Sequence, residues 1–165
     1  MRAEAPESEI IVDANESWTP VLYAEYAAEL ARLRVRLVEQ PLPAGQDAAL
    51  DGLGRGVPLC ADESVHDTQD LAAAARRYDF INIKLDKAGG LTKAIRRVQY
   101  AQERGIGVII GCMIGTSLGI APAFLLGAFA SVIDLDAPLL LSHDRTPGIA
   151  YDGGLMQPPP AELWG

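Results

Sequence analysis

Short apolar runs alternate with longer segments of helical periodicity along almost the whole chain, and this alternation limits the fold more than any other feature. The runs are rich in Val, Ile and Leu, and each ends at a polar or charged residue. They cover residues 10–15, 35–41, 57–64, 80–86, 106–113 and 131–136. Such runs are typical of parallel strands covered on both faces. The alternation predicts an α/β fold with right-handed crossovers between parallel strands. We expect one domain over residues 1–165, with 151–165 as a Gly/Pro-rich C-terminal tail.

The segments between the runs carry helix signals. Pro20 can open a helix with Thr19 as its N-cap, because proline is favoured in the first turn and threonine oxygen can accept a free backbone N–H. Asp67 is a candidate cap for a later helix, Arg76 and Arg77 suit the end of that helix, and Gly105 is a candidate C-terminal glycine. The remaining segments expected to be helical are 46–53, 67–77, 91–104 and 116–130.

Length and charge exclude several classes of protein. The chain has 165 residues, whereas a complete (β/α)8 barrel takes about 250. A net charge of −8 argues against nucleic acid or an anionic membrane as the main partner. No apolar run is long enough for a membrane helix, and the first residues do not resemble a signal peptide. Cys60 and Cys112 lie in apolar runs without metal spacing, so we expect buried thiols, no disulfide and a cytoplasmic protein.

Charged residues end four consecutive apolar runs. Asp13, Glu39, Asp62 and Lys84 follow one another at intervals of about one strand–helix unit, and Asp134 comes two units after Lys84. The carboxyl ends of parallel strands share one face of the sheet, which is where α/β folds build their sites. A single charged residue at a strand end is commonly a cap or a solvated loop residue. Four in register at a constant interval are much harder to obtain by chance.

The chemistry of this set suggests a metal-assisted proton transfer. Three carboxylates that converge on one site need a cation between them, and Mg²⁺ prefers oxygen ligands with positions left open for substrate. Positive charge near a lysine lowers its pKa, so the amine could act as a base near neutral pH. These parts suit abstraction of a proton beside a substrate carboxylate.

The chain resembles the enolase superfamily, in its muconate-lactonizing-enzyme subgroup, and within it the dipeptide epimerases of the L-Ala-D/L-Glu type. The matching motifs are VDANESWTP (12–20), VEQPLP (38–43), CADESVH (60–66), INIKLDKAGGL (81–91), GCMIGTSLG (111–119) and DLDAPLLL (134–141). The resemblance implies a partial TIM-type (β/α)7β barrel with six parallel strands, the third to the eighth. It also implies that the N-terminal capping domain and the first two barrel strands are absent from this sequence.

The resemblance assigns roles to individual residues. It implies that Asp13, Glu39 and Asp62 hold Mg²⁺ and that Lys84 is the acid/base lysine, with Lys87 in the loop beyond. It implies an isomerase that epimerises a dipeptide by removing the α-proton through a metal-stabilised enediolate. The substrate-binding residues implied are Asp134 and Asp136, which would hold the substrate ammonium group, together with Cys112, Met113 and Asn15.

One expected motif is missing, and alternatives therefore remain. Family members carry a KxK motif on the second barrel strand, with the lysine for the opposite face of the substrate, and this sequence has no KxK. The chain could be a non-catalytic truncated or split fragment. It could also belong to another muconate-lactonizing-type enzyme, such as a cycloisomerase, a succinylbenzoate synthase or a dehydratase, or to a Schiff-base aldolase that uses Lys84. Expected partners are a small dipeptide, and either a complementing N-terminal half or further copies of the chain.

Overall fold

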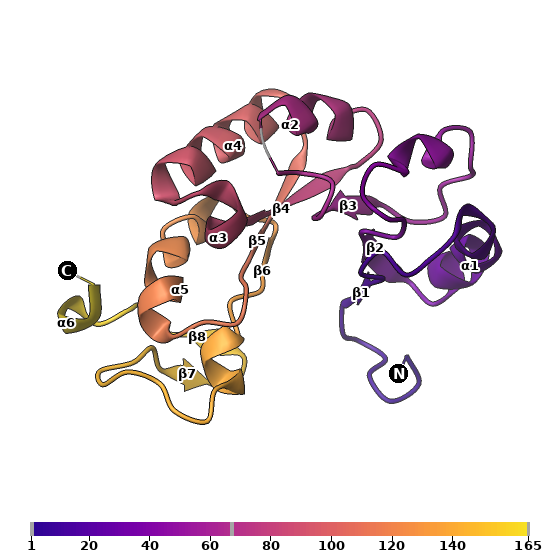
Figure 1. The fold of residues 1–165 in the computed structure, drawn as a ribbon. Coiled ribbons are helices and arrows are strands. Elements are labelled where there is room, and N and C mark those ends of the chain that lie inside the picture. Colours follow the sequence, from indigo (N-terminus) through magenta and orange to yellow (C-terminus); the bar gives the residue numbers. More distant parts are fainter. Residues whose placement is uncertain (1, 67, 165) are drawn as a thin grey trace. The chain divides into compact units, whose positions relative to one another are not determined.

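The computed structural model of the chain describes residues 2–66 and 68–164. It divides into two compact units, Met1–Ile81 and Asn82–Gly165, and the boundary falls inside strand β4 (Phe80–Lys84) (Figure 1). Among the described residues, the strands of the main sheet are hydrogen-bonded in the order in which they occur along the chain. We describe the two units separately.

The first unit is built from parallel strands and the segments that connect them. Its elements are β1 (Ile10–Asp13), α1 (Pro20–Arg32), β2 (Val35–Glu39), the 3-10 helix η1 (Asp47–Leu50), β3 (Leu59–Ala61), α2 (Thr68–Ala74) and the start of β4. The pairs β1–β2, β2–β3 and β3–β4 are all parallel. Leu37 and Val38 of β2 are fully buried, which fits a strand covered on both faces.

In the first unit the predicted start of helix α1 is confirmed, whereas the two helices predicted after it are shorter than expected. Thr19 caps α1, since its Oγ1 accepts the backbone N–H of Leu22 at 3.2 Å. The segment 46–53 forms only the short η1. Helix α2 ends at Ala74 and not at Arg77, whose guanidinium instead pairs with the Asp51 carboxylate at 2.7 Å. The expected cap Asp67 lies outside the described residues.

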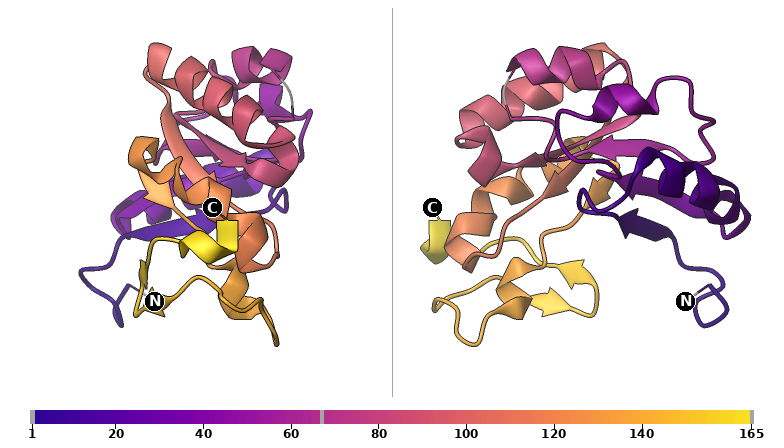
Figure 2. Two further views of the ribbon diagram at one scale, coloured as in Figure 1. Left: turned by 90° about the vertical axis from the view of Figure 1, so that its left-hand side faces the viewer. Right: turned by 45° about the vertical axis from the view of Figure 1, so that its right-hand side comes forward.

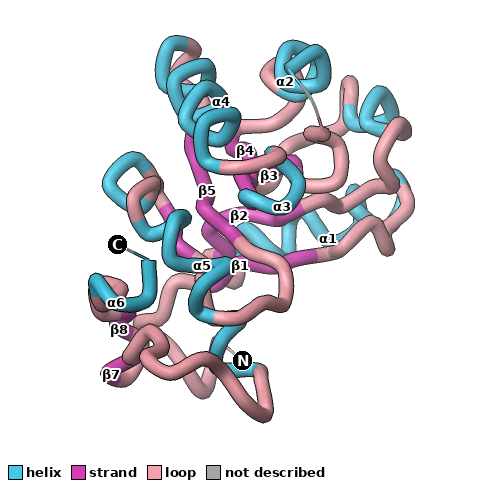
Figure 3. Tube along the Cα trace, turned by 60° about the vertical axis from the view of Figure 1, so that its left-hand side comes forward, coloured by secondary structure: helices cyan, strands magenta, loops and turns pink. Residues whose placement is uncertain are grey.

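The second unit continues the alternation and then changes character. Its elements are the end of β4, α3 (Leu85–Ala88), α4 (Leu91–Glu103), β5 (Gly107–Gly111), α5 (Ser117–Phe124), η2 (Gly127–Phe129), β6 (Val132–Ile133), η3 (Ala137–Leu140), β7 (Tyr151–Asp152), β8 (Leu155–Met156) and α6 (Ala161–Trp164). Helix α4 packs against β5 (Figure 3), and Gly105 follows it with a left-handed φ of 67°, as its position predicted. The pair β5–β6 is parallel.

One expectation in the second unit needs correction. The apolar stretch 116–130 is not one helix, because α5 stops at Phe124, two residues after Pro122, and a separate 3-10 turn follows. The described part of the tail, residues 151–164, contains regular elements. Strands β7 and β8 form an antiparallel hairpin around Gly153 and Gly154, and α6 packs against α5 (Figure 2).

The α/β fold class is confirmed. Six strands, in chain order and joined mainly by helices, form the main sheet of the described residues. Both cysteines are free thiols, with Cys60 buried and Cys112 only half-buried, so the expectation of burial holds for the first alone. Among the described residues, none of the helices has the length and apolar character needed to cross a membrane.

Candidate functional site

In the first unit, the sheet register brings two of the predicted metal ligands side by side. Asp13 is the last residue of β1 and Glu39 the last of β2, and the two are register partners. Glu39 is in turn the partner of Cys60 in β3, and Asp62 lies two residues beyond Cys60. Because alternate residues of a strand point to the same face, Asp13, Glu39 and Asp62 belong to one face at the carboxyl ends of three neighbouring strands.

Burial separates these three carboxylates. Glu39 and Asp62 are 7% and 1% exposed, whereas Asp13 is exposed. Asp13 Oδ1 accepts the backbone N–H of Asn15 at 2.8 Å, in a turn where Asn15 has a positive φ of 45°. Asparagine tolerates this conformation better than most residues. Asn15 is therefore placed beside Asp13, on the turn that leads from β1 into α1.

The donor chemistry of these residues fits a hard divalent cation. Carboxylate oxygens are the ligands that Mg²⁺ takes, and carboxylates withdrawn from water are stabilised by a cation or by hydrogen-bond donors. Within residues 2–66 and 68–164, no three His, Cys, Asp or Glu side chains are gathered closely enough to form a metal-binding group. The assignment of Asp13, Glu39 and Asp62 as ligands stays a prediction, supported by their type and by their register.

In the second unit, three of the predicted site residues lie near a fourth, Cys112. Lys84 ends β4, Cys112 directly follows β5, and Asp134 directly follows β6. The Cys112 thiol donates to the Asp134 backbone carbonyl, with 3.4 Å between Sγ and O. Burial raises the pKa of this thiol above its ordinary value, the Asp134 and Asp136 charges raise it further, and Lys84 lowers it. The lysine and both aspartates therefore lie within electrostatic range of Cys112.

The two aspartates of the DLD segment both face away from the core. Asp134 and Asp136 are exposed, while Leu135 between them is 4% exposed. Met113, next to Cys112, is 46% exposed. The carboxylates and the Met113 side chain are thus accessible to a ligand, which a substrate-binding role requires.

Residue Tyr151 supports the DLD segment and had no signal in the sequence, since it lies in the region expected to be a tail. Its hydroxyl donates to the Leu135 carbonyl at 2.6 Å. Burial raises its pKa to about 12, with smaller contributions from the negative charges of Cys112, Asp136 and Asp144. The tyrosine therefore stays protonated at neutral pH and can hold the backbone between the two aspartates.

The start of helix α5 is also tied down in a way that sequence patterns did not reveal. Ser117 is fully buried, and its backbone N–H donates to Asp144 Oδ1 at 2.9 Å. Its hydroxyl donates to the other Asp144 oxygen and accepts the Ile149 N–H at 2.8 Å. These bonds fix the end of the segment that carries Cys112 and Met113.

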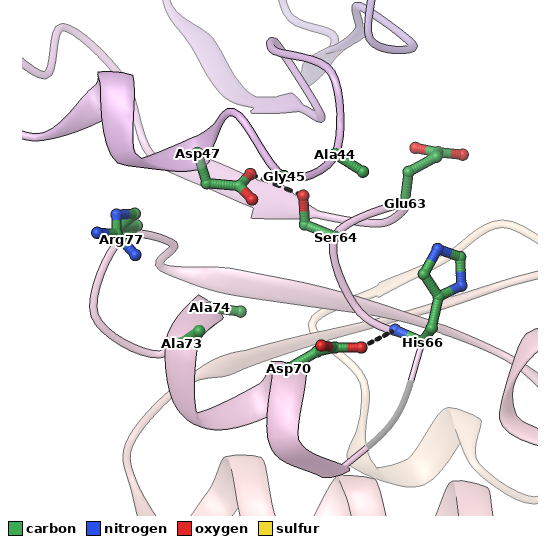
Figure 4. A pocket seen from close by; sticks show the side chains of 10 residues that line it. All are labelled: Ala44, Gly45, Asp47, Glu63, Ser64, His66, Asp70, Ala73, Ala74 and Arg77. Carbon is green, nitrogen blue, oxygen red and sulfur yellow. Dashed lines mark hydrogen bonds between the residues drawn. The ribbon is translucent and has the colours of Figure 1, made fainter.

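A small cavity of about 190 Å³ lies in the first unit, with Glu63, Ser64 and His66 on one side of it (Figure 4). Ser64, Asp47 and His66 are among the residues that line it, and the Ser64 hydroxyl donates to Asp47 Oδ1 at 2.7 Å. The second unit has a larger groove of about 640 Å³, whose lining includes Asp134, Asp136 and Tyr151 beside apolar side chains.

Comparison with known proteins identifies a matching family. The model of the enolase C-terminal domain-like family matches residues 1–161. The chain is 48% identical over 161 residues to an N-acetyl-D-glutamate racemase from Pseudoalteromonas sp., covering 98% of this chain and 51% of the relative. It is 43% identical over 154 residues to the L-Ala-D/L-Glu epimerase of Escherichia coli K12, covering 93% and 48%. The chain therefore spans about half the length of these relatives.

Solved structures also match almost the whole of this chain and about half of their own length. An enolase family member from Agrobacterium tumefaciens with homology to dipeptide epimerases, solved with sodium and L-Ala-L-Glu, has a TM-score of 0.95 and 52% identity, over 99% of this chain and 50% of that one. A dipeptide epimerase from Cytophaga hutchinsonii, solved with Mg and D-Ala-L-Val, has a TM-score of 0.83 and 26% identity, over 92% and 44%. Similar structures thus hold cations and dipeptides.

Proposed function

The chain belongs to the enolase C-terminal domain-like family, and from that premise we propose that it carries the metal ligands and one acid/base lysine of a dipeptide epimerase. The observation that carries the proposal is the position of the charged residues. Asp13, Glu39 and Lys84 each end a strand, and Asp62 and Asp134 each follow one directly. Side chains at the carboxyl ends of parallel strands are where such folds perform chemistry.

In this proposal Asp13, Glu39 and Asp62 hold Mg²⁺. The ion, when bound, supplies positive charge beside the substrate carboxylate and so favours loss of the neighbouring α-proton. The three carboxylates supply three hard oxygen donors and leave further positions for water or substrate. A dipeptide epimerase of similar structure has been solved with Mg and with a dipeptide, which supports the choice.

Lys84 exchanges the proton with the substrate α-carbon. A lysine amine can take up a proton as the neutral base and return one as the ammonium ion, which is general acid–base catalysis. Lys84 is half-buried at the end of β4, so part of its side chain is accessible to a ligand while the strand fixes its position. Lys87 lies three residues later, in α3, and its substitution serves as the control for substitution of Lys84.

The substrate class follows from the DLD segment. Asp134 and Asp136 present two exposed carboxylates near Cys112, and these would bind the ammonium group of a dipeptide such as Ala-Glu. Cys112, Met113 and Asn15 would contact the rest of the substrate. An N-acylated glutamate, the substrate class in the name of the Pseudoalteromonas relative, has no ammonium group for these aspartates. A dipeptide therefore fits the segment better.

Epimerisation needs an acid/base group on each face of the planar intermediate, and this sequence supplies one lysine in the expected place. The second group would come from an N-terminal half, which would be either part of a longer chain or a separate chain. The alternative partner is a further copy of this chain. Without such a half, the chain would be a non-catalytic fragment. We also propose a cytoplasmic location, which suits its free thiols.

The test is α-proton exchange in the full-length protein. We would incubate it with L-Ala-L-Glu and Mg²⁺ in D₂O and follow both the α-proton and the appearance of the epimer by NMR. Lys84→Met should lower the epimerisation rate by about 10²–10⁴-fold, the usual contribution of a general acid–base group, while Lys87→Met should leave it nearly unchanged. Absence of exchange in the unaltered protein, or equal rates in the two variants, would contradict the proposal. A cycloisomerase or a dehydratase would need a different substrate, because L-Ala-L-Glu has neither an alkene to cyclise onto nor a β-hydroxyl group to lose as water.

A further inference from the structure

We propose that Gln40 is a positioning residue for the metal site. Gln40 directly follows Glu39, and its side-chain amide bonds to the backbone of Asp62, so it connects the two predicted ligands. The inference rests on the proposed function, in which Glu39 and Asp62 are ligands of the same cation. It adds a residue that touches neither metal nor substrate and that sets the spacing of two ligands on neighbouring strands.

The contacts of the Gln40 side chain are complete. Its Oε1 accepts the backbone N–H of Asp62 at 2.9 Å and that of Ser64 at 3.1 Å. Its Nε2 donates to the Leu42 carbonyl at 2.9 Å, to Ser64 Oγ at 2.8 Å and, at the longer distance of 3.4 Å, to the Tyr78 hydroxyl. A primary amide has two N–H donors and two acceptor positions, so its whole capacity is engaged. The residue is 0% exposed.

The backbone of Gln40 is held in an unusual conformation. Its φ of 33° lies in the left-handed region, which a residue other than glycine enters only at a cost in free energy. Its N–H donates to the Cys60 carbonyl at 2.9 Å, and its carbonyl accepts the Glu16 N–H at 2.8 Å. The reversal after Glu39 turns the Gln40 side chain into the protein, where it reaches the segment that follows β3.

A second layer of polar groups fixes the amide in turn. Ser64 Oγ accepts from Gln40 and donates to Asp47 Oδ1, as Figure 4 shows for the Ser64–Asp47 bond. The Tyr78 hydroxyl donates to the same Asp47 oxygen at 2.5 Å. Burial, more than any other cause, raises the Tyr78 pKa, so the hydroxyl keeps its proton. The chain of bonds therefore runs from η1 through Ser64 and Gln40 to Asp62.

The bond from Gln40 reaches the backbone of Asp62 and not its carboxylate. This bond fixes the backbone of Asp62 without itself using a carboxylate oxygen of that residue. Groups that hold metal ligands in place from outside typically change metal affinity by about 10–100-fold when they are replaced. Loss of the amide should accordingly weaken metal binding.

The experiment measures Mn²⁺ binding to the full-length protein from the electron paramagnetic resonance signal of free Mn²⁺. Gln40→Met keeps the length of the side chain and removes its hydrogen bonds, and we expect it to raise the Mn²⁺ dissociation constant by about 10-fold or more. Gln46→Met is the matched control, because Gln46 is exposed and its side chain makes no capping bond to η1. We expect that control to change the dissociation constant by less than about 2-fold, like most surface substitutions.

Three further results are informative. A purely structural role would lower the metal-free melting temperature of Gln40→Met and leave the Mn²⁺ dissociation constant unchanged, which would overturn the inference but not the proposed function. Failure of the unaltered protein to bind Mn²⁺ would overturn both. If Gln40→Met does not fold, Gln40→Asn replaces it, since asparagine accepts the positive φ but is one methylene too short for the bridge. An unchanged dissociation constant in Gln40→Asn would then also overturn the inference.

Discussion

Gly111, the last residue of β5, packs so closely against Asn82 that a single methyl group should disturb the second unit. An ideal Cβ at Gly111 would lie 2.6 Å from Asn82 Oδ1, 2.9 Å from Nδ2 and 3.1 Å from Cγ. Asn82 is 5% exposed and its side chain is short, so it has little room to move away. The Gly111 backbone is not in the left-handed region, and alanine is therefore excluded there by contact and not by conformation.

Overpacking of this kind costs about 1–3 kcal/mol, and we expect Gly111→Ala to lower the free energy of unfolding by that amount. The assay is equilibrium urea unfolding, with the midpoint and the slope compared between variants. Gly119→Ala is the control, and we expect it to raise the free energy of unfolding instead of lowering it. Gly119 lies in α5, and a Cβ added there would have no neighbouring atom within 4 Å, so alanine should stabilise the helix by about 0.5–1 kcal/mol.

A double variant shows whether the contact itself is responsible. Asn82→Ala removes the amide, so the cost of Gly111→Ala should be smaller in that background, with an interaction energy of about 0.5–3 kcal/mol. A Gly111→Ala protein as stable as the unaltered one would refute the reasoning, as would an equal cost with and without the Asn82 amide. Asn82 and Lys84 are alternate residues on one face of β4, so this packing also bears on the proposed acid/base lysine.

The remaining predictions concern the anchor of α5 and the cap of α1. Ser117→Ala leaves the buried Ile149 N–H without its acceptor, which should cost about 1–3 kcal/mol in urea unfolding. The Ser117 hydroxyl is the main reason why the pKa of Asp144 lies below its ordinary value of 3.8. The stabilisation is therefore present above pH 3.8 and is lost as the pH falls through the lowered pKa, so Asp144→Asn should flatten the stability profile in that range. Thr19→Ala should cost about 1 kcal/mol by thermal unfolding, because the Leu22 N–H loses its cap.

Much of the architecture could be predicted because local patterns determine it. The six apolar runs each contain one strand of the main sheet among the described residues, and Thr19 and Gly105 flank the two long helices as their residue types suggest. The charged residues at the strand ends could also be recognised in the sequence, because each apolar run stops at a polar or charged residue.

Features that depend on tertiary contacts could not be predicted. Strands β7 and β8 have two residues each, too few for any periodicity, and they form through the turn at Gly153 and Gly154. Helix α2 ends before Arg77, and that side chain reaches Asp51, 26 residues earlier, a contact that no local pattern indicates. The roles of Gln40 and Tyr151 likewise rest on partners distant in the chain.

The central claim is that the strand-end residues of this chain form one metal-assisted proton-transfer site. The most direct measurement is a crystal structure of the full-length protein with Mg²⁺ and L-Ala-L-Glu. Our account predicts a cation with oxygens of Asp13, Glu39 and Asp62 at about 2.0–2.1 Å, and the Lys84 amine about 3–3.5 Å from the α-carbon. A cation held by other residues, or a Lys84 amine turned away from the α-carbon, would contradict it.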